Sequence, residues 1–205
     1  MADLRAFREA VSGWAAGGSG GSASDLVVRL GVRTVVLLEG PSDLAAVEAL
    51  AARRGRDLTA EGICVMQMGG AMSIGRYAGL LGPPGLGLRL AGLCDEGEQR
   101  FFERGLKRAR VSRRDFFVCV TDLEDELIRA LGTARVEEIV RAEGDSRAWQ
   151  TFLHQPAQHG RSRQQQLRRF LGTKKGRKIR YGSLLVEALG PDQVPVPLDD
   201  LLTNL

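Results

Sequence analysis

The sequence has little that would place it at a membrane or in an oxidising compartment. None of its apolar runs approaches the ~20 residues of a membrane-spanning helix, and residues 1–10 lack the apolar core of a signal peptide. Only three cysteines occur, Cys64, Cys94 and Cys119, each in or beside an apolar run. An odd and widely spaced set of this kind predicts buried thiols in a reducing compartment, and it argues against a disulfide framework or a zinc site. We therefore expect a cytoplasmic protein with no membrane partner.

The chain also lacks a nucleotide-binding P-loop, because no Gly-x-x-x-x-Gly-Lys-Ser/Thr motif occurs in it. We therefore expect no ATP site in these 205 residues. What the chain does have is an ordinary globular composition, with 43% hydrophobic and 26% charged residues. Its length is sufficient for one sizeable α/β domain, alone or with a small appendage.

Apolar runs and helical patterns alternate along the first two thirds of the chain. Short apolar runs predict strands at about 34–38, 62–67, 88–93 and 116–120, and the segments between them predict helices at about 41–54, 73–81 and 98–108. Near-continuous apolar strands that alternate with helices indicate a parallel sheet covered on both faces. We assign residues 25–131 to this α/β domain.

Segments without strand character precede and follow this domain. Apolar residues at three- and four-residue spacing predict an amphipathic helix over about residues 1–17; they are Leu4, Phe7, Val11 and Trp14. The glycines and serines of 17–22 then predict a flexible linker, so that residues 1–24 form an N-terminal appendage. After the sheet, residues 132–205 are predicted to form a helical, basic extension, with helices at about 133–143, 146–154, 162–171 and 182–189 and a short one at 198–202.

Carboxylates follow the predicted strands at the points where the strands end. Glu39 follows the first strand, Asp95 the third and Asp122 the fourth. The carboxyl ends of parallel strands meet at one edge of a sheet, so these three side chains are expected to lie close together. Carboxylate oxygens without histidine or cysteine partners favour a hard cation such as Mg²⁺ or Mn²⁺. Two such ions would suit phosphoryl transfer or phosphodiester hydrolysis.

A second group of acidic residues is open to two interpretations. Asp43, Glu98 and Glu124 lie shortly beyond the same strand ends, where they could extend the metal site. Each also lies at the predicted start of a helix, where negative charge is favourable without any ligand. The spacing alone does not separate the two interpretations.

The motifs at these strand ends resemble the Toprim domain, and in particular the nuclease part of OLD-family proteins. They are Leu-Leu-Glu-Gly-Pro-Ser-Asp at 37–43, Gly69-Gly70, Ala-Gly-Leu-Cys-Asp at 91–95, and Val-Thr-Asp-Leu-Glu-Asp-Glu-Leu at 120–127. The similarity extends over about residues 33–190. It implies a three-layer, Rossmann-like α/β fold with a parallel sheet of about four strands, to which the helical extension is added.

The resemblance also implies roles for the acidic residues. In Toprim proteins the glutamate that corresponds to Glu39 acts as a general acid/base or metal ligand, and the later aspartate pair binds magnesium. That pair is normally Asp-x-Asp, whereas this chain has Asp95-Glu96-Gly97-Glu98. Either Glu98 replaces the second aspartate or one ion is held more weakly. OLD proteins normally carry an ATPase before the Toprim part, so the resemblance implies a separate ATPase or a Toprim part that acts alone.

The extension is notable for the acidic residues that it lacks. Residues 146–186 contain no Asp or Glu but hold ten of the 29 Lys and Arg residues. A basic lobe beside an acidic metal site is the layout expected for a nuclease, because the lobe holds the phosphate backbone; a generic solvated basic face is the alternative. Residues 172–178 are predicted to form a flexible loop that could wrap a nucleic-acid backbone. OLD nucleases also use a lysine from beyond the sheet, for which Lys178 is the first candidate and Lys175 the second.

Together these observations predict a divalent-metal-dependent DNA endonuclease or nicking enzyme that hydrolyses phosphodiester bonds. The alternative is a non-catalytic Toprim module that binds nucleic acid in repair or recombination. The predicted catalytic residues are Glu39, Asp95 and Lys178; the predicted metal ligands are Glu39, Asp43, Asp95, Glu98, Asp122 and Glu124; the predicted DNA-binding residues are Arg168, Arg169, Lys174, Lys175, Arg177 and Arg180. A homodimer is left open.

Overall fold

The centre of the fold is a sheet of four parallel strands. A computed structural model describes residues 2–205, apart from the side chains of Ala2, Asp3 and Lys175. The strands are β1 (Thr34–Leu38), β2 (Ile63–Gln67), β3 (Arg89–Asp95) and β4 (Phe116–Cys119), and they lie in the order β2-β1-β3-β4. In the central register Val36 of β1 lies opposite Val65 of β2 and Ala91 of β3. The four strand predictions and the parallel arrangement are confirmed.

The alternation of side chains along β1 explains why both faces of the sheet are covered. All five of its residues are buried. Val35 and Leu37 belong to one hydrophobic cluster, and Val36 and Leu38 belong to another. Successive strand residues point to opposite faces, so an apolar residue at every position requires helices on both sides.

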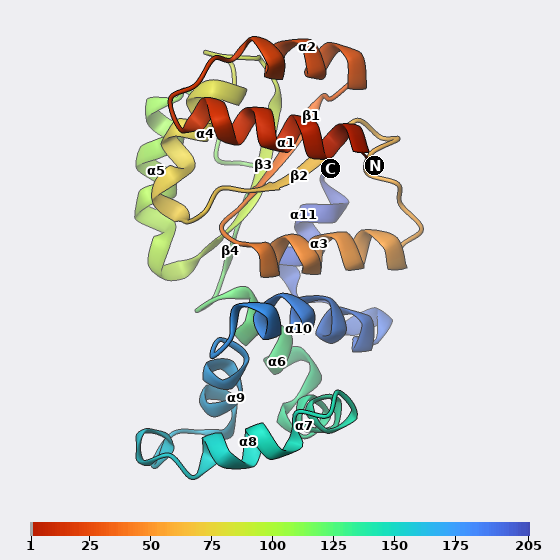
Figure 1. The fold of residues 1–205 in the computed structure, drawn as a ribbon, viewed down its shortest axis with the longest axis vertical. Helices are drawn as coiled ribbons and strands as arrows, with labels where there is room; N and C mark the ends of the chain where they lie inside the picture. The colour runs from red at the N-terminus through yellow and green to blue at the C-terminus, as the bar shows by residue number, and fades with distance from the viewer. Residues whose placement is uncertain (1) are drawn as a thin grey trace.

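Two sets of helices supply this cover (Figure 1). On one face lie α1 (Ala2–Ala15), α4 (Ile74–Leu81) and α5 (Gln99–Arg108), with α2 (Gly21–Leu30) packed on α1; on the other face lie α3 (Pro41–Arg53) and α11 (Val196–Thr203). Two short 3-10 turns, η1 (Ala71–Ser73) and η2 (Glu96–Glu98), precede α4 and α5. The predicted three-layer α/β fold is therefore confirmed.

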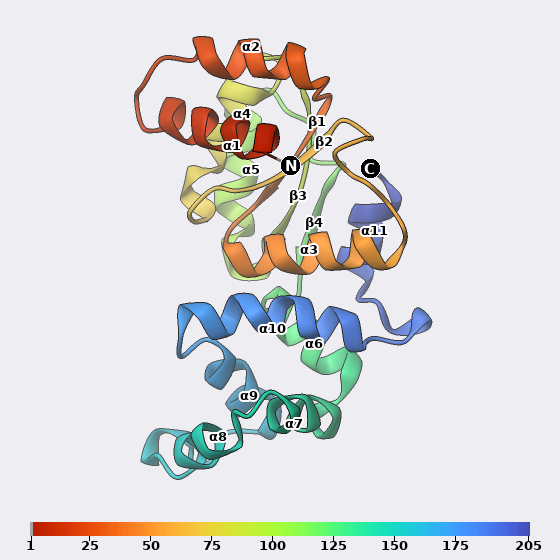
Figure 2. The same ribbon diagram turned by 45° about the vertical axis from the view of Figure 1, so that its right-hand side comes forward.

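A helical lobe lies beyond α3. It contains α6 (Leu123–Leu131), α7 (Thr133–Ala142), α8 (Ser146–Leu153), α9 (Arg163–Leu171) and α10 (Lys175–Ala188), together with the turns η3 (Pro156–Gln158) and η4 (Pro191–Gln193). Its core contains three aromatic rings, with Trp149 and Phe152 centred 5.0 Å and 5.5 Å from Phe170. Figures 1 and 2 both show α10 running beside α3, so this helix joins the lobe to the sheet domain.

The N-terminal segment packs on the sheet domain. Phe7 and Val11 of α1 are fully buried in the cluster that contains Val35 and Leu37, which confirms the amphipathic helix. The predicted linker is shorter than expected, because residues 21–30 form α2. Apolar residues at helical spacing in this segment outweigh the low helix propensity of its glycine and serines.

The C-terminal extension also differs from its prediction at two places. Residues 175–178 are the first turn of α10 and are not part of a flexible loop. The last helix, α11, returns to the sheet, where Leu198, Leu201 and Leu202 are buried in the same cluster as Val36. Residues 196–203 therefore cover the sheet and are not part of the helical lobe. Within the described chain, none of the helices has the length and apolar character needed to span a bilayer.

Candidate active site

Glu39 lies where the chain leaves β1 at the carboxyl edge of the sheet. Gly40 is extended, and Pro41 occupies the first turn of α3, where its missing N–H is no loss. One carboxylate oxygen of Glu39, Oε1, accepts a hydrogen bond from the backbone N–H of Asp95 at 3.3 Å. This bond joins the ends of β1 and β3, so two of the predicted site residues do meet.

Asp43 caps a helix and also lies near the other carboxylates, so both interpretations of its position still apply. Its carboxylate accepts the N–H of Gly40 at 3.0 Å, which caps the start of α3. The same side chain also faces the other carboxylates of this edge. Burial, followed by the negative charge of Glu124, raises the pKa of Asp43 to about 7.

Asp95 and Glu39 show the same electrostatic conflict. Burial and then the charge of Glu39 raise the pKa of Asp95 to about 8, with smaller contributions from Asp43 and Asp122. Burial also raises the pKa of Glu39, and the charges of Glu98 and Asp122 act in the same direction. Like charges in a poorly solvated place favour protonation, so this edge is arranged to attract positive charge.

Lys178 of α10 supplies part of that positive charge. Its Nζ lies 3.1 Å from an Oε1 of Glu124, whose side chain is only 7% exposed. Burial disfavours the Lys178 ammonium, but the charge and hydrogen bond of Glu124 outweigh burial and raise its pKa. The positive charge of Lys178 also acts to lower the pKa values of Asp43 and Glu39, against the larger effect of burial. The structure thus brings the first lysine candidate to the carboxylates, whereas the side chain of the second, Lys175, lies outside what the structure describes.

Both carboxylate oxygens of Asp122 already accept hydrogen bonds within the fold. One oxygen accepts the N–H of Asp125 at 2.8 Å and caps α6, and the other accepts a hydrogen bond from Arg168 Nε at 2.6 Å. Thr121, the residue before it, has a left-handed backbone with φ of 69°. This conformation is strained for a β-branched residue, and such strain clusters at functional sites. Asp122 can contribute a metal ligand only if it shares or gives up one of these partners.

Glu98 comes from η2, just before α5, whereas Lys178 comes from α10, which packs on α3. Glu98 lines a pocket of about 350 Å³ together with Glu39, Gly69 and Gly70. Gly97, in the middle of η2, stands in open space, with no atom within 4 Å of where a Cβ would be. The second aspartate of the usual Asp-x-Asp pair would therefore fit here, but this chain offers Glu98 in its place.

The donor set suits a hard divalent cation. The carboxylates are the oxygen ligands that Mg²⁺ and Mn²⁺ prefer, and a cation would relieve the repulsion that raises their pKa values. Among the residues that the structure describes, no three acidic, histidine or cysteine side chains already stand close enough to hold an ion. Binding would therefore draw the carboxylates together from the positions seen here.

Two contacts seat α10 on α3 and so place Lys178. At Gly182, one turn after Lys178, an added Cβ would lie 2.6 Å from the carbonyl oxygen of Ser42, so only glycine permits this approach. At the other end, the guanidinium of Arg53 donates to the carbonyls of Val186 and, at 2.8 Å, Leu189. Both contacts join residues more than 130 positions apart, and neither motif has a signature in the sequence.

The predicted DNA-binding cations fall into two groups. Arg168 pairs with Asp122, and Arg180 pairs with Asp145 at 2.6 Å and Glu143 at 3.5 Å. Arg169 and Lys174 are exposed and make no ion pair with the described side chains. Of the ten cations in residues 146–186, five are paired within the fold: Arg163, Arg168, Arg177, Lys178 and Arg180.

Arg177 was predicted to bind DNA, but the structure buries it. It is only 8% exposed, its Nη2 lies 3.0 Å from Asp145, and its guanidinium lies 4.1 Å from the centre of the Phe170 ring. Its hydrogen bonds to Asp145 hold the pKa of that carboxyl below its usual range, and Tyr181 also donates to Asp145 at 3.0 Å. Arg177 is therefore a buried anchor that fixes the start of α10.

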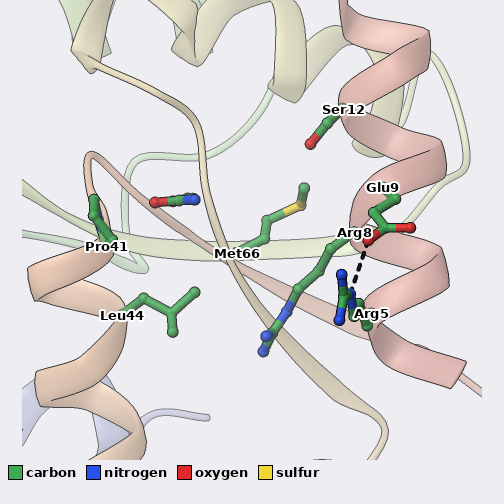
Figure 3. Close-up of a pocket in the computed structure, with 8 residues that line it drawn as sticks. Arg5, Arg8, Glu9, Ser12, Pro41, Leu44 and Met66 are labelled. Carbon is green, nitrogen blue, oxygen red and sulfur yellow. Dashed lines mark hydrogen bonds and ion pairs between the residues drawn. The ribbon is translucent and has the colours of Figure 1, made fainter. Parts of the chain in front are cut away.

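A separate hollow of about 340 Å³ lies beside β2, between α1 and the start of α3. Figure 3 shows Arg8 extending from α1 toward β2, with Leu44 on the opposite side. Among the described residues that line it, the one acidic side chain is Glu9, which pairs with Arg5 at 2.9 Å. This hollow does not offer a set of carboxylates, so it is not the candidate metal site.

Comparison with known proteins agrees with this fold. Residues 32–96 match a family model described as "Overcoming lysogenization defect protein-like, TOPRIM domain". The C-terminal region of the Burkholderia pseudomallei OLD protein has the same fold, with a TM-score of 0.63 and 20% identity over 84% of this chain and 96% of that one. The C-terminal region of the Xanthomonas campestris pv. campestris OLD protein matches with a TM-score of 0.63 and 25% identity over 84% and 93%. No curated protein sequence matches the chain.

The close packing of α10 against α3 can be tested by substituting Gly182. Gly182→Ala forces a Cβ against the Ser42 carbonyl and should lower the free energy of unfolding by about 1–3 kcal/mol. The control is Gly176→Ala on the same helix, where nothing lies within 4 Å and alanine should be neutral or stabilising. Chemical denaturation of both variants measures the difference, and equal stabilities would show that the close approach is not what seats α10.

Proposed function

The chain carries a Toprim domain of the OLD-like type, and from that premise we propose that it is a DNA endonuclease that depends on Mg²⁺ or Mn²⁺. The observation that carries the proposal is that Glu39, Asp43, Asp95 and Glu124 lie near enough at one edge for their charges to act on one another, with Lys178 paired to Glu124. A buried acidic edge of this kind costs stability without a cation and suits phosphodiester hydrolysis with one.

The residues of the site divide the work of hydrolysis. Bound divalent ions, in our proposal two, would activate a water and stabilise the leaving oxygen. Glu39 and Asp95 face each other across the ends of β1 and β3 and would hold the ions, with Asp43, Glu98, Asp122 and Glu124 as further ligands. Lys178 presents an ammonium that stays protonated beside Glu124 and would stabilise charge that develops on the phosphate.

The DNA backbone would be held beside this edge by the cations that the fold leaves free. A groove of about 500 Å³ between α8 and the start of α10 is lined by Arg147 and Lys174, together with Thr151 and Thr173. Arg147 and Lys174 are exposed and have no ion-pair partner among the described residues. Lys174 lies one helical turn before Lys178, so a strand in this groove would lead toward the carboxylates. A separate ATPase partner and a homodimer remain predictions.

A plasmid cleavage assay tests the catalytic proposal. Glu39→Gln removes the charge at the end of β1 and should reduce nicking in Mg²⁺ or Mn²⁺ by at least about 100-fold. Glu138→Gln is the matched control, because Glu138 is an exposed residue of α7 that pairs only with Arg135 in the described chain. If the wild type binds DNA but never nicks it with either ion, the endonuclease proposal fails.

Gly97 favours the second candidate, a non-catalytic nucleic-acid-binding module, because it occupies the place of a metal-binding aspartate. The open space at this position allows a direct test. If Glu98 has taken over the role, Glu98→Gln should raise the Mg²⁺ concentration for half-maximal cleavage by about tenfold, and adding Gly97→Asp should restore it.

Gly97→Asn in the same Glu98→Gln background is the control, because it adds a side chain of the same size without the charge. Cleavage that appears only after Gly97→Asp would instead show that the natural chain is the non-catalytic module. Rescue by asparagine as well as aspartate would contradict a role in metal binding.

Salt titration of DNA affinity tests the proposed groove. Each phosphate contact contributes about one unit to the slope of log K against log salt, so Arg147→Ala with Lys174→Ala should reduce the slope by about 2. Arg135→Ala is the control, because Arg135 is an exposed cation of α7 that is paired with Glu138. An unchanged slope in the double variant would place the DNA on another surface.

A further inference from the structure

The pocket on the α5 side of Glu39 has a character that phosphate binding does not explain. Its volume is about 350 Å³, within the range of small-molecule sites. Glu39 and Glu98 line it, and no Lys, Arg or His does so among the described residues. The N–H of Gly70 donates to the carbonyl of Glu39 at 3.0 Å, which holds the glycine turn against the end of β1. Without a bound metal ion these two carboxylates would repel a phosphate group, and with one the phosphate would lie at the ion, so the rest of the pocket is open to another group.

Two large apolar side chains line the same pocket and are exposed to solvent. Met72 of η1 is 80% exposed and Phe101 of α5 is 43% exposed. Single exposed apolar residues need no explanation, but two in one pocket beside a candidate catalytic residue indicate a ligand with an apolar face. Folding gains little from leaving them in water, so their contribution is expected when that ligand binds.

A nucleobase has the properties that this pocket selects. It is neutral and planar, it stacks on aromatic rings and thioethers, and its N–H groups can donate to carboxylates. Because Glu39 belongs both to the pocket and to the candidate metal site, a base held here would belong to a nucleotide next to the phosphate under attack.

We propose that the pocket formed by Met72, Phe101 and Glu98 holds an unstacked base beside the scissile phosphate, so that the preferred substrate is DNA with an unpaired nucleotide at the cleavage position. This inference rests on the proposed endonuclease function. A base in an intact duplex is stacked and paired, and it enters such a pocket only after unstacking, which costs free energy that an already unpaired base does not pay.

Cleavage of matched substrates tests the inference. The wild type should cleave a duplex with one unpaired nucleotide at least about tenfold faster, in kcat/KM, than the same duplex fully paired. Phe101→Ala with Met72→Ala should lower the rate on the duplex with the unpaired nucleotide by about tenfold, because stacking on a side chain is worth about this factor. The rate on the fully paired duplex should fall less, because its base mostly stays stacked outside the pocket. Phe101→Trp should keep the preference.

Val28→Ala is the control, because Val28 is an apolar residue 83% exposed on α2 and does not line the pocket. The inference is overturned if the wild type cleaves both substrates equally, or if the double variant slows both to the same extent. A loss of folding would appear in the second case as an equal loss on both substrates, and circular dichroism of the variant separates it from a specific effect.

A binding measurement separates failure of this inference from failure of the endonuclease proposal. DNA with 5-iodouracil at the unpaired position is irradiated on the protein with Ca²⁺ in place of Mg²⁺, and the cross-linked peptide is identified. Cross-links at Phe101 or Met72 that are at least about tenfold weaker with paired iodouracil support the base pocket even if no DNA is cut. Cross-links elsewhere, or equal cross-links to both DNAs, contradict it.

Discussion

The poor solvation and mutual repulsion of the carboxylates at the carboxyl edge of the sheet are the constraint on which the rest of this structure depends. Glu39, Asp43 and Asp95 have raised pKa values because the sheet edge that holds them is poorly solvated and carries several other carboxylates. The fold offsets part of this cost with backbone N–H groups at Gly40 and Asp95 and with the ammonium of Lys178. What remains is an edge that a divalent cation would stabilise, which is the usual compromise between stability and activity at catalytic sites.

The helical lobe places Lys178 at that edge of the sheet. Arg177, stacked on Phe170 and paired with Asp145, fixes the start of α10 within the lobe. Gly182 and Arg53 then fix the rest of the helix on α3. A lysine so placed depends on two packed interfaces, so its position is sensitive to changes far from the chemistry. Much of the basic charge of the lobe is used in ion pairs that hold the lobe together. Only the remaining cations are available to bind a nucleic acid.

Much of the fold could be predicted from local pattern. The apolar runs gave the strands because a strand buried on both faces needs an apolar residue at nearly every position, as β1 has. The segments whose backbone was predicted wrongly, residues 21–24 and 175–178, each contain a glycine that predicts irregular backbone. Their helices are held by tertiary contacts, through Ala23 in the α1 cluster and Arg177 in the lobe, and such contacts outweigh local propensity.

The sequence by itself determined which residues stand at the ends of the strands, because strand ends and the acids that follow them are local features. It therefore determined that Glu39, Asp95 and Asp122 share one edge. Only the tertiary structure decided which cations face them, since Lys178 and Arg168 reach the edge from another lobe, whereas Arg177, one residue away from Lys178, turns inward. Likewise, only the fold placed Met72 and Phe101 in one pocket with Glu39. A helix directs adjacent residues to different faces, and no local pattern records which face meets a distant strand.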